Sequence, residues 1–207
     1  MSKSKVYRGE YMPTENNGDA EREEKLRKCI EESLKYSNSQ IYLPPIYNPP
    51  ILSCVSAQTQ QQKIVETAKE KVDSTDWAKM KEKPPYGGAG KWKCNLFVYD
   101  ALTQAGAKVP LETRWSISNF GYVSYPPLAG QWGDPSHTIQ GWVVVTDPQP
   151  GDVAAIPSNA GGASGHVGIV SGDGKTISAT DKSVVENDWG FRDDQKGTVV
   201  FRRYVGQ

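Results

Sequence analysis

The first half of the chain carries apolar residues at helical spacing. In residues 20–37 they recur every three or four positions among charged residues, which predicts a short amphipathic helix. Residues 41–52, IYLPPIYNPPIL, hold four prolines, which exclude a regular helix and favour an extended surface linker over an SH3-type ligand. A second amphipathic helix is predicted over residues 58–72. Its expected buried face consists of Ile64, Val65, Ala68 and Val72.

A third helix is predicted to begin at residue 94, directly after the glycine-rich turn GAGKWK. Gly106 suits the position just after the helix, and Pro110 lies beyond its end. The predicted buried face follows the spacing i, i+4, i+7, i+8 and i+11. It consists of Cys94, Val98, Ala101, Leu102 and Ala105.

The second half of the chain changes to short β-rich runs separated by turn residues. Residues 111–141 hold few strong signals, and SYPPLAGQWGD at 124–134 is predicted to be an irregular loop with aromatic residues. SNAGGASG at 158–165 predicts a flexible loop, and SGDG at 171–174 predicts a hairpin turn. Strands are predicted at 141–147, 150–157, 166–170, 175–180 and 197–205.

Helices followed by a run of antiparallel strands indicate an α+β fold. The change in composition and hydrophobic pattern along the chain predicts two parts. Residues 1–57 form an arm with a charged helix and the proline-rich segment, and residues 58–207 form one domain. A chain of 207 residues suits one well-packed domain with an appendage.

Charge and composition remove several classes of function. Lysine and arginine together number 24, as do aspartate and glutamate, so no strong global field favours nucleic acid. No apolar run approaches the roughly 18 residues of a membrane span. The first residues lack the apolar region of a secretory signal, so we expect synthesis in the cytoplasm without a signal peptide.

Candidate chemistry concentrates on few residues, because the chain has three cysteines and two histidines. Cys29, Cys54 and Cys94 fit no zinc-finger spacing and no disulfide framework. Cys94 stands at a predicted helix N-terminus, where free N–H groups and the helix dipole lower a thiol pKa. This suits a nucleophile, whereas its spacing with Val98 also permits an ordinary buried cysteine.

His166 begins a predicted strand directly after the glycine-rich loop, where it could act as the general base for Cys94. A surface histidine at a strand end is the plain alternative. His137 is expected to be a loop residue, or to line a substrate groove. A zinc site formed by Cys94, Asp134, His137 and His166 has suitable ligand types but no short-range ligand pair, and is not favoured.

Five blocks in order resemble a known family. These are IVETAKEKV, YGG at 86–88, the helix that begins with Cys94, QPGDVAAI, and GHVGIVSGDGKTISA. Together they resemble NlpC-type cell-wall peptidases and the related cysteine–histidine amidohydrolase/peptidase (CHAP) domains of the papain-like superfamily. The resemblance covers roughly residues 60–205 and implies helices packed on an antiparallel β-sheet.

The resemblance also implies roles for particular residues. Cys94 corresponds to the nucleophile, His166 to the base, and Tyr86 to a tyrosine that lines the site. The residue that orients the imidazole stays open. Its candidates are Ser178, Asp181, Asn187 and Asp188, the last two being expected in a turn. The family's usual Asp-Cys-Ser is replaced by Lys93-Cys94-Asn95, so Lys93 and Asn95 are candidates for substrate binding.

The implied function is hydrolysis of a peptide or amide bond of peptidoglycan through a thioester, with no metal and no other cofactor. We expect an effector toxin injected into a rival cell by type VI secretion, with an immunity protein and the secretion machinery as partners. A phage-type lysin released to the wall is the alternative route. A non-catalytic module that binds wall peptides or a protein, and a thiol protease or acyl-transfer enzyme acting on protein, are the competing functions.

Overall fold

The computed structural model describes residues 24, 27, 28, 31, 58–118, 120–158, 162–193 and 197–206. Residues Gln58–Gln207 form one compact unit. The proline-rich segment and most of the charged helix predicted at 20–37 lie outside the described residues. Within that helix, Arg27 donates to Glu24 at 2.7 Å and to Glu31 at 3.3 Å. The predicted role of residues 1–57 as a separate arm stays a prediction.

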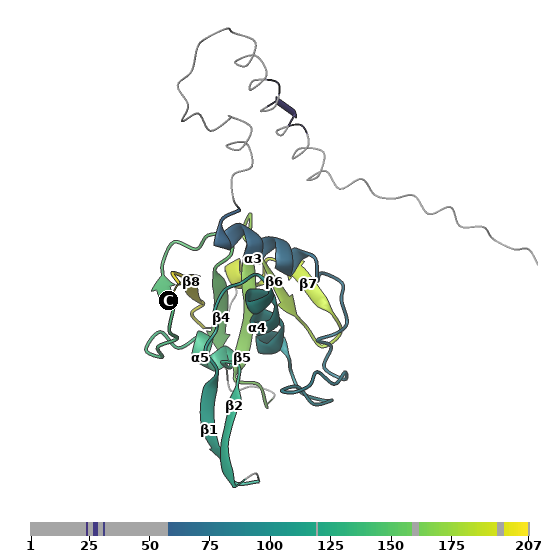
Figure 1. Ribbon diagram of the computed structural model, residues 1–207, viewed down its shortest axis with the longest axis vertical. Coiled ribbons are helices and arrows are strands. Elements are labelled where there is room, and N and C mark those ends of the chain that lie inside the picture. Colours follow the sequence, from purple (N-terminus) through teal and green to yellow (C-terminus); the bar gives the residue numbers. More distant parts are fainter. Residues whose placement is uncertain are drawn as a thin grey trace, which may run out of the picture. The chain divides into compact units, whose positions relative to one another are not determined.

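A six-stranded antiparallel sheet forms the centre of the unit (Figure 1). Its strand order is β3-β8-β4-β5-β6-β7, so the C-terminal strand lies inside the sheet, between β3 and β4. The strands are β3 (Trp142–Val145), β4 (Val153–Pro157), β5 (Gly165–Gly172), β6 (Lys175–Ala179), β7 (Val184–Asn187) and β8 (Val200–Tyr204).

Two helices, α3 (Gln60–Lys69) and α4 (Cys94–Gln104), pack on the same side of this sheet and both contact β5 (Figure 1). The predicted α+β fold is therefore confirmed. Helix α3 begins with a capping box, in which Thr59 accepts from the amide of Gln62 and Gln62 accepts from the amide of Thr59. Helix α4 ends at Gln104, and Gly106 directly follows its C-cap, Ala105, with a φ of +88° that favours glycine.

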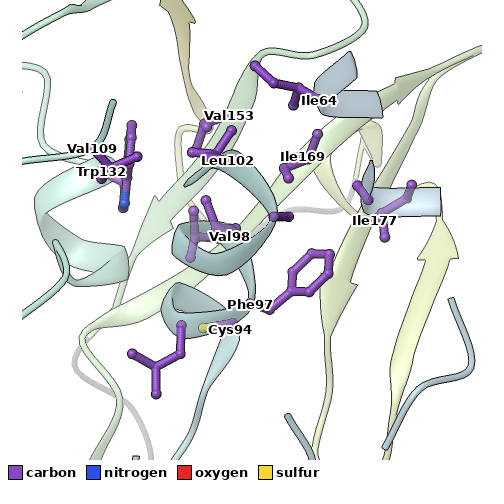
Figure 2. Packing of buried hydrophobic residues seen from close by; sticks show 14 of the residues in the cluster. Ile64, Cys94, Phe97, Val98, Leu102, Val109, Trp132, Val153, Ile169 and Ile177 are labelled. Carbon is purple, nitrogen blue, oxygen red and sulfur yellow. The ribbon is translucent and has the colours of Figure 1, made fainter. Parts of the chain in front are cut away.

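The core lies between α4 and the sheet (Figure 2). The α4 face predicted from its spacing is buried throughout, from Cys94 to Ala105. Strand β4 is buried from Val153 to Ile156, and the short 3-10 helix η2 (Trp189–Phe191) packs against the neighbouring strand β6. Gly190 of η2 lies so close to Thr176 and Ala154 that a side chain there would require Thr176 to move.

Residues 111–141, which hold few signals in the sequence, contain a hairpin of β1 (Glu112–Ser116) and β2 (Gly121–Tyr125). The loop predicted at 124–134 is wrong in part, because this range includes the end of β2 and the short helix α5 (Ala129–Trp132). Neither strand of the hairpin contains a buried residue, so the hydrophobic signal that reveals a strand in a sequence is weak. Strand β7 was also missed, because its last residue, Asn187, was assigned to a turn.

Substitution of Ile169 tests the position of the core. The side chain is fully buried on β5, so Ile169→Ala should lower the free energy of unfolding by about 2–5 kcal/mol. Val144→Ala is the matched control, because Val144 is 45% exposed and its loss should change stability by no more than about 0.5 kcal/mol. Urea unfolding followed by circular dichroism measures both values. Equal, small effects would contradict this assignment of the core.

Candidate active site

The first turn of α4 places the Cys94 side chain in the interior. Cys94 is only 5% exposed, and its sulfur lies at the beginning of the helix (Figure 2). Lys93, at the N-cap, provides no side-chain cap for the first N–H groups of the helix. The sulfur of Cys94 interacts with three backbone N–H groups, those of Cys94 itself, Asn95 and Val167. The last of these belongs to β5 and directly follows His166.

The protonation of Cys94 differs from the prediction. Burial raises the pKa of the Cys94 thiol, and the opposing effect of the N–H groups of Val167, Asn95 and Cys94 is smaller. The expectation of a lowered thiol pKa is therefore wrong for this resting structure. A sequence reveals the helix N-terminus, whereas the depth at which the sulfur lies depends on how the helix packs on β5.

His166 lies on β5 between two contacts that fix its ring. Its Nε2 atom lies 3.0 Å from Oγ of Ser178 on β6, a residue only 1% exposed. The ring of Trp189 packs edge-to-face on the imidazole, with centroids 4.5 Å apart and planes at 85°. Burial lowers the pKa of His166 to about 4, so the imidazole is neutral at pH 7. With Nε2 donating to Ser178, the unprotonated nitrogen is Nδ1.

The structure separates the candidates for orienting His166. Ser178 contacts the ring, whereas Asp181 lies beyond the end of β6 with an exposed side chain, and its backbone oxygen accepts from Lys79. Asn187 accepts from the amide of Trp189, and Asp188 pairs with Arg192. Trp189 was not singled out from the sequence, because nothing local distinguishes it from other loop aromatics.

A pocket of about 230 Å³ lies beside Cys94. Among the described residues that line it, only Lys91 carries a formal charge. One wall forms through close approach of the backbone: the amide of Gly130 donates to Oγ of Ser164, and a side chain at Gly165 would collide with the carbonyl of Ile156. The lining residues are Lys91, Trp92, Cys94, Asn95, Leu128, Ala129, Gly162, Ala163, Ser164 and Gly165.

Of the predicted substrate-binding residues, Asn95 alone lines this pocket. Its side-chain amide donates to the carbonyl of Pro127 at 3.4 Å. Lys93 is 1% exposed, and its ammonium donates to three backbone carbonyls, those of Ala78, Lys79 and Lys91. A contact between Lys93 and a substrate would require one of these bonds to open, so the structure gives Lys93 a role in holding the preceding loop.

Tyr86 and His137 lie outside the residues that line the pocket. Tyr86 is 39% exposed and packs edge-to-face on Tyr99, with centroids 6.2 Å apart. His137 lies near the start of β1, where Nε2 is 2.9 Å from a carboxylate oxygen of Glu112. The carboxylate of Asp134 accepts from Ser136. Among the described residues, no group of three or more His, Cys, Asp or Glu side chains could hold a metal ion.

Comparison with known proteins identifies part of the chain. Residues 85–182, which include Cys94, His166 and Ser178, match the family model of the CHAP domain. The chain is similar to the structure of the type VI native effector–immunity complex Tae3–Tai3 from Ralstonia pickettii, at 20% identity over 68% of this chain and 98% of that one, with a TM-score of 0.38.

A second similar structure is NlpC2 from Trichomonas vaginalis, at 18% identity over 72% of this chain and 49% of that one, with a TM-score of 0.39. No curated protein sequence matches.

The half-buried His166 predicts a pH dependence of stability, because its surroundings disfavour the imidazolium. The pKa of His166 is about 4 in the folded protein and near 6.5 when exposed, so the unfolded chain binds the extra proton between these values. The free energy of unfolding should therefore fall as the pH is lowered from about 6.5 to about 4. His166→Gln should lose this component, and His137→Gln should keep it. Urea unfolding at several pH values measures the slopes, and equal slopes for wild type and His166→Gln would contradict the burial of His166.

Proposed function

From the match of residues 85–182 to the CHAP domain, we propose that the protein is a CHAP-type cysteine hydrolase of the NlpC/papain-like superfamily and that it cleaves an amide or peptide bond of bacterial peptidoglycan. The observation that carries the proposal is the meeting of α4 and β5. The thiol of Cys94 lies at the amide that follows His166, and His166 is held from behind by Ser178. The pocket beside Cys94 gives a substrate access to the sulfur.

The proposed reaction begins from a neutral pair, since burial disfavours both the thiolate and the imidazolium. Nδ1 of His166 accepts the thiol proton as the sulfur attacks the substrate carbonyl carbon. The carbonyl oxygen becomes an oxyanion, which the backbone N–H groups at the start of α4 can stabilise. His166 then donates its proton to the departing amine, and a thioester to Cys94 is left.

Water completes the proposed cycle. His166 removes a proton from a water molecule, which attacks the thioester carbonyl. The C–S bond then breaks, the acid is released, and the sulfur takes the proton from His166, so that Cys94 is a thiol again. In the tautomer that this mechanism requires, Nε2 of His166 donates to Oγ of Ser178, 3.0 Å away, and Nδ1 is left free to accept the proton. Cleavage between stem-peptide residues and cleavage of the amide between peptide and sugar both fit this chemistry.

We further propose delivery to the periplasm of a target cell as an antibacterial effector, with an immunity protein as partner. Tae3 is an effector whose crystal structure includes its immunity protein. The similarity between Tae3 and this chain concerns the fold alone, and the compartment experiment below tests the effector role directly. Release to the wall as a phage-type lysin is the alternative route.

Digestion of purified peptidoglycan tests the enzyme directly. Wild type should release soluble fragments, and Cys94→Ala and His166→Ala should each lower the rate by about 10³-fold or more. Ser178→Ala should lower it by about ten- to a hundredfold, because the imidazole would lose its orientation. Mass spectrometry of the fragments measures the rates and identifies the bond.

His137→Ala is the matched histidine control and should retain activity, because His137 lies outside the pocket lining. Undiminished turnover by Cys94→Ala would reject the mechanism. Specific binding of wall fragments by wild type without any cleavage would favour the non-catalytic module. Cleavage of protein substrates but not of wall would favour the thiol protease.

Targeting to different compartments tests the effector role. Expression in a Gram-negative host with an added periplasmic signal should cause lysis, whereas cytoplasmic expression should leave growth unaffected, because peptidoglycan is outside the inner membrane. Growth curves and cell counts measure both. Cys94→Ala with the same signal controls for the burden of export, and equal toxicity in both compartments would contradict the proposal.

A further inference from the structure

The β1–β2 hairpin extends away from the six-stranded sheet as a two-stranded sheet of its own (Figure 1). Its register runs from Glu112 opposite Tyr125 to Ser116 opposite Gly121. The turn is closed by a hydrogen bond from the amide of Phe120 to the carbonyl of Ile117. The two strands of the hairpin are therefore held together by their own backbone pairing.

The far end of the hairpin carries four large side chains that the fold leaves uncovered. Ile117 and Phe120, at the turn, are 79% and 85% exposed. Trp115 and Tyr122, in the second pair of the ladder counted from the turn, are 57% and 78% exposed and pack edge-to-face with centroids 5.4 Å apart. We call these four residues the hairpin tip. Exposed apolar side chains of this size do not stabilise the fold. A group of them on the surface therefore indicates a site that binds another molecule.

The large side chains along the hairpin are graded in polarity. Ile117 and Phe120 stand at the turn, which also contains Ser118, and Ser116 and Gly121 form the first row of the ladder. The second row holds Trp115 and Tyr122, whose rings combine an apolar body with one polar group. Arg114 follows, with its guanidinium 5.2 Å from the ring centre of Tyr125. The carboxylate of Glu112 lies at the base, paired with His137. From Trp115 to Gly133 the sequence contains no charged residue.

We propose that the hairpin tip inserts into the boundary between headgroups and acyl chains of a phospholipid bilayer. The order of the large side chains matches the polarity gradient at this depth: Ile117 and Phe120 would enter the acyl region, Trp115 and Tyr122 would lie at the interface, and Arg114 behind them would meet anionic headgroups. The serines between them are small and would stay within reach of water and headgroups. Two rows of a strand span about 7 Å, which agrees with the roughly 5–10 Å reached by interfacial segments. A glycan or a protein partner would not require this order.

The hairpin is joined directly to the candidate active site. Leu128 and Ala129, three and four residues after the end of β2, line the pocket beside Cys94. Insertion of the tip would therefore hold the pocket close to the membrane surface. The inference does not depend on the proposed catalysis, because bilayer binding requires no reaction. It also differs from a membrane span, since no helix among the described residues is long and apolar enough to cross a bilayer.

Vesicle flotation with the full chain tests the proposal. We expect wild type to float with vesicles of phosphatidylcholine and phosphatidylglycerol, and the double variant Ile117→Ser/Phe120→Ser to partition at least about tenfold less, since two inserted apolar side chains are lost. Val143→Ser/Val144→Ser is the matched control, because these side chains on β3 are 43% and 45% exposed and should not affect binding. Circular dichroism verifies that each variant is folded.

Three outcomes would overturn the proposal. Wild type could fail to float, or the hairpin variant could float as well as wild type. Alternatively, the hairpin substitutions could weaken binding to lipid-free peptidoglycan while leaving flotation unchanged, which would assign the tip to the glycan. Digestion of peptidoglycan by the same variants, measured in parallel without lipid, separates this result from a failure of the proposed catalysis.

Discussion

The contact between the first turn of α4 and β5 is the interaction on which the candidate site depends. Cys94 belongs to the same apolar helix face as Val98 and Leu102, so the packing that buries the helix also fixes the sulfur. On the other side of the contact, the thiol lies at the amide of Val167, one residue from His166. The residues that bury α4 against the sheet therefore also hold the proposed nucleophile in position.

The depth of this contact determines the charge of the pair. Burial raises the pKa of Cys94 and lowers that of His166, so each group is neutral before a substrate arrives. Burial penalises both the thiolate and the imidazolium. The proton is therefore transferred from Cys94 to His166 only as the sulfur attacks the carbonyl carbon of a bound substrate. Lys93 adds a buried cation next to Cys94, but its donors are directed to the carbonyls of the loop that precedes the helix.

The sequence predicted the features that depend on local pattern. The apolar spacing after Cys94 identified α4 and its buried face, and β-rich runs identified β5 with His166 at its beginning. Features set by three-dimensional packing could not be predicted in this way. Examples are the direction of the Cys94 pKa, the carbonyl partners of Lys93, and the contact of Ser178 rather than Asp181 with His166. The exposed hairpin was missed for a related reason, because its strands bury neither face.

The central claim is that Cys94 attacks a substrate carbonyl and carries the acyl group. Intact-protein mass spectrometry after a rapid acid quench, during digestion of soluble wall fragments, tests it most directly, because acid stops the hydrolysis of a thioester. The account predicts a transient mass increase equal to the acyl part of the substrate, located on the peptide that contains Cys94. Turnover of the same fragments with no adduct at Cys94, or with an adduct on another residue, would contradict it.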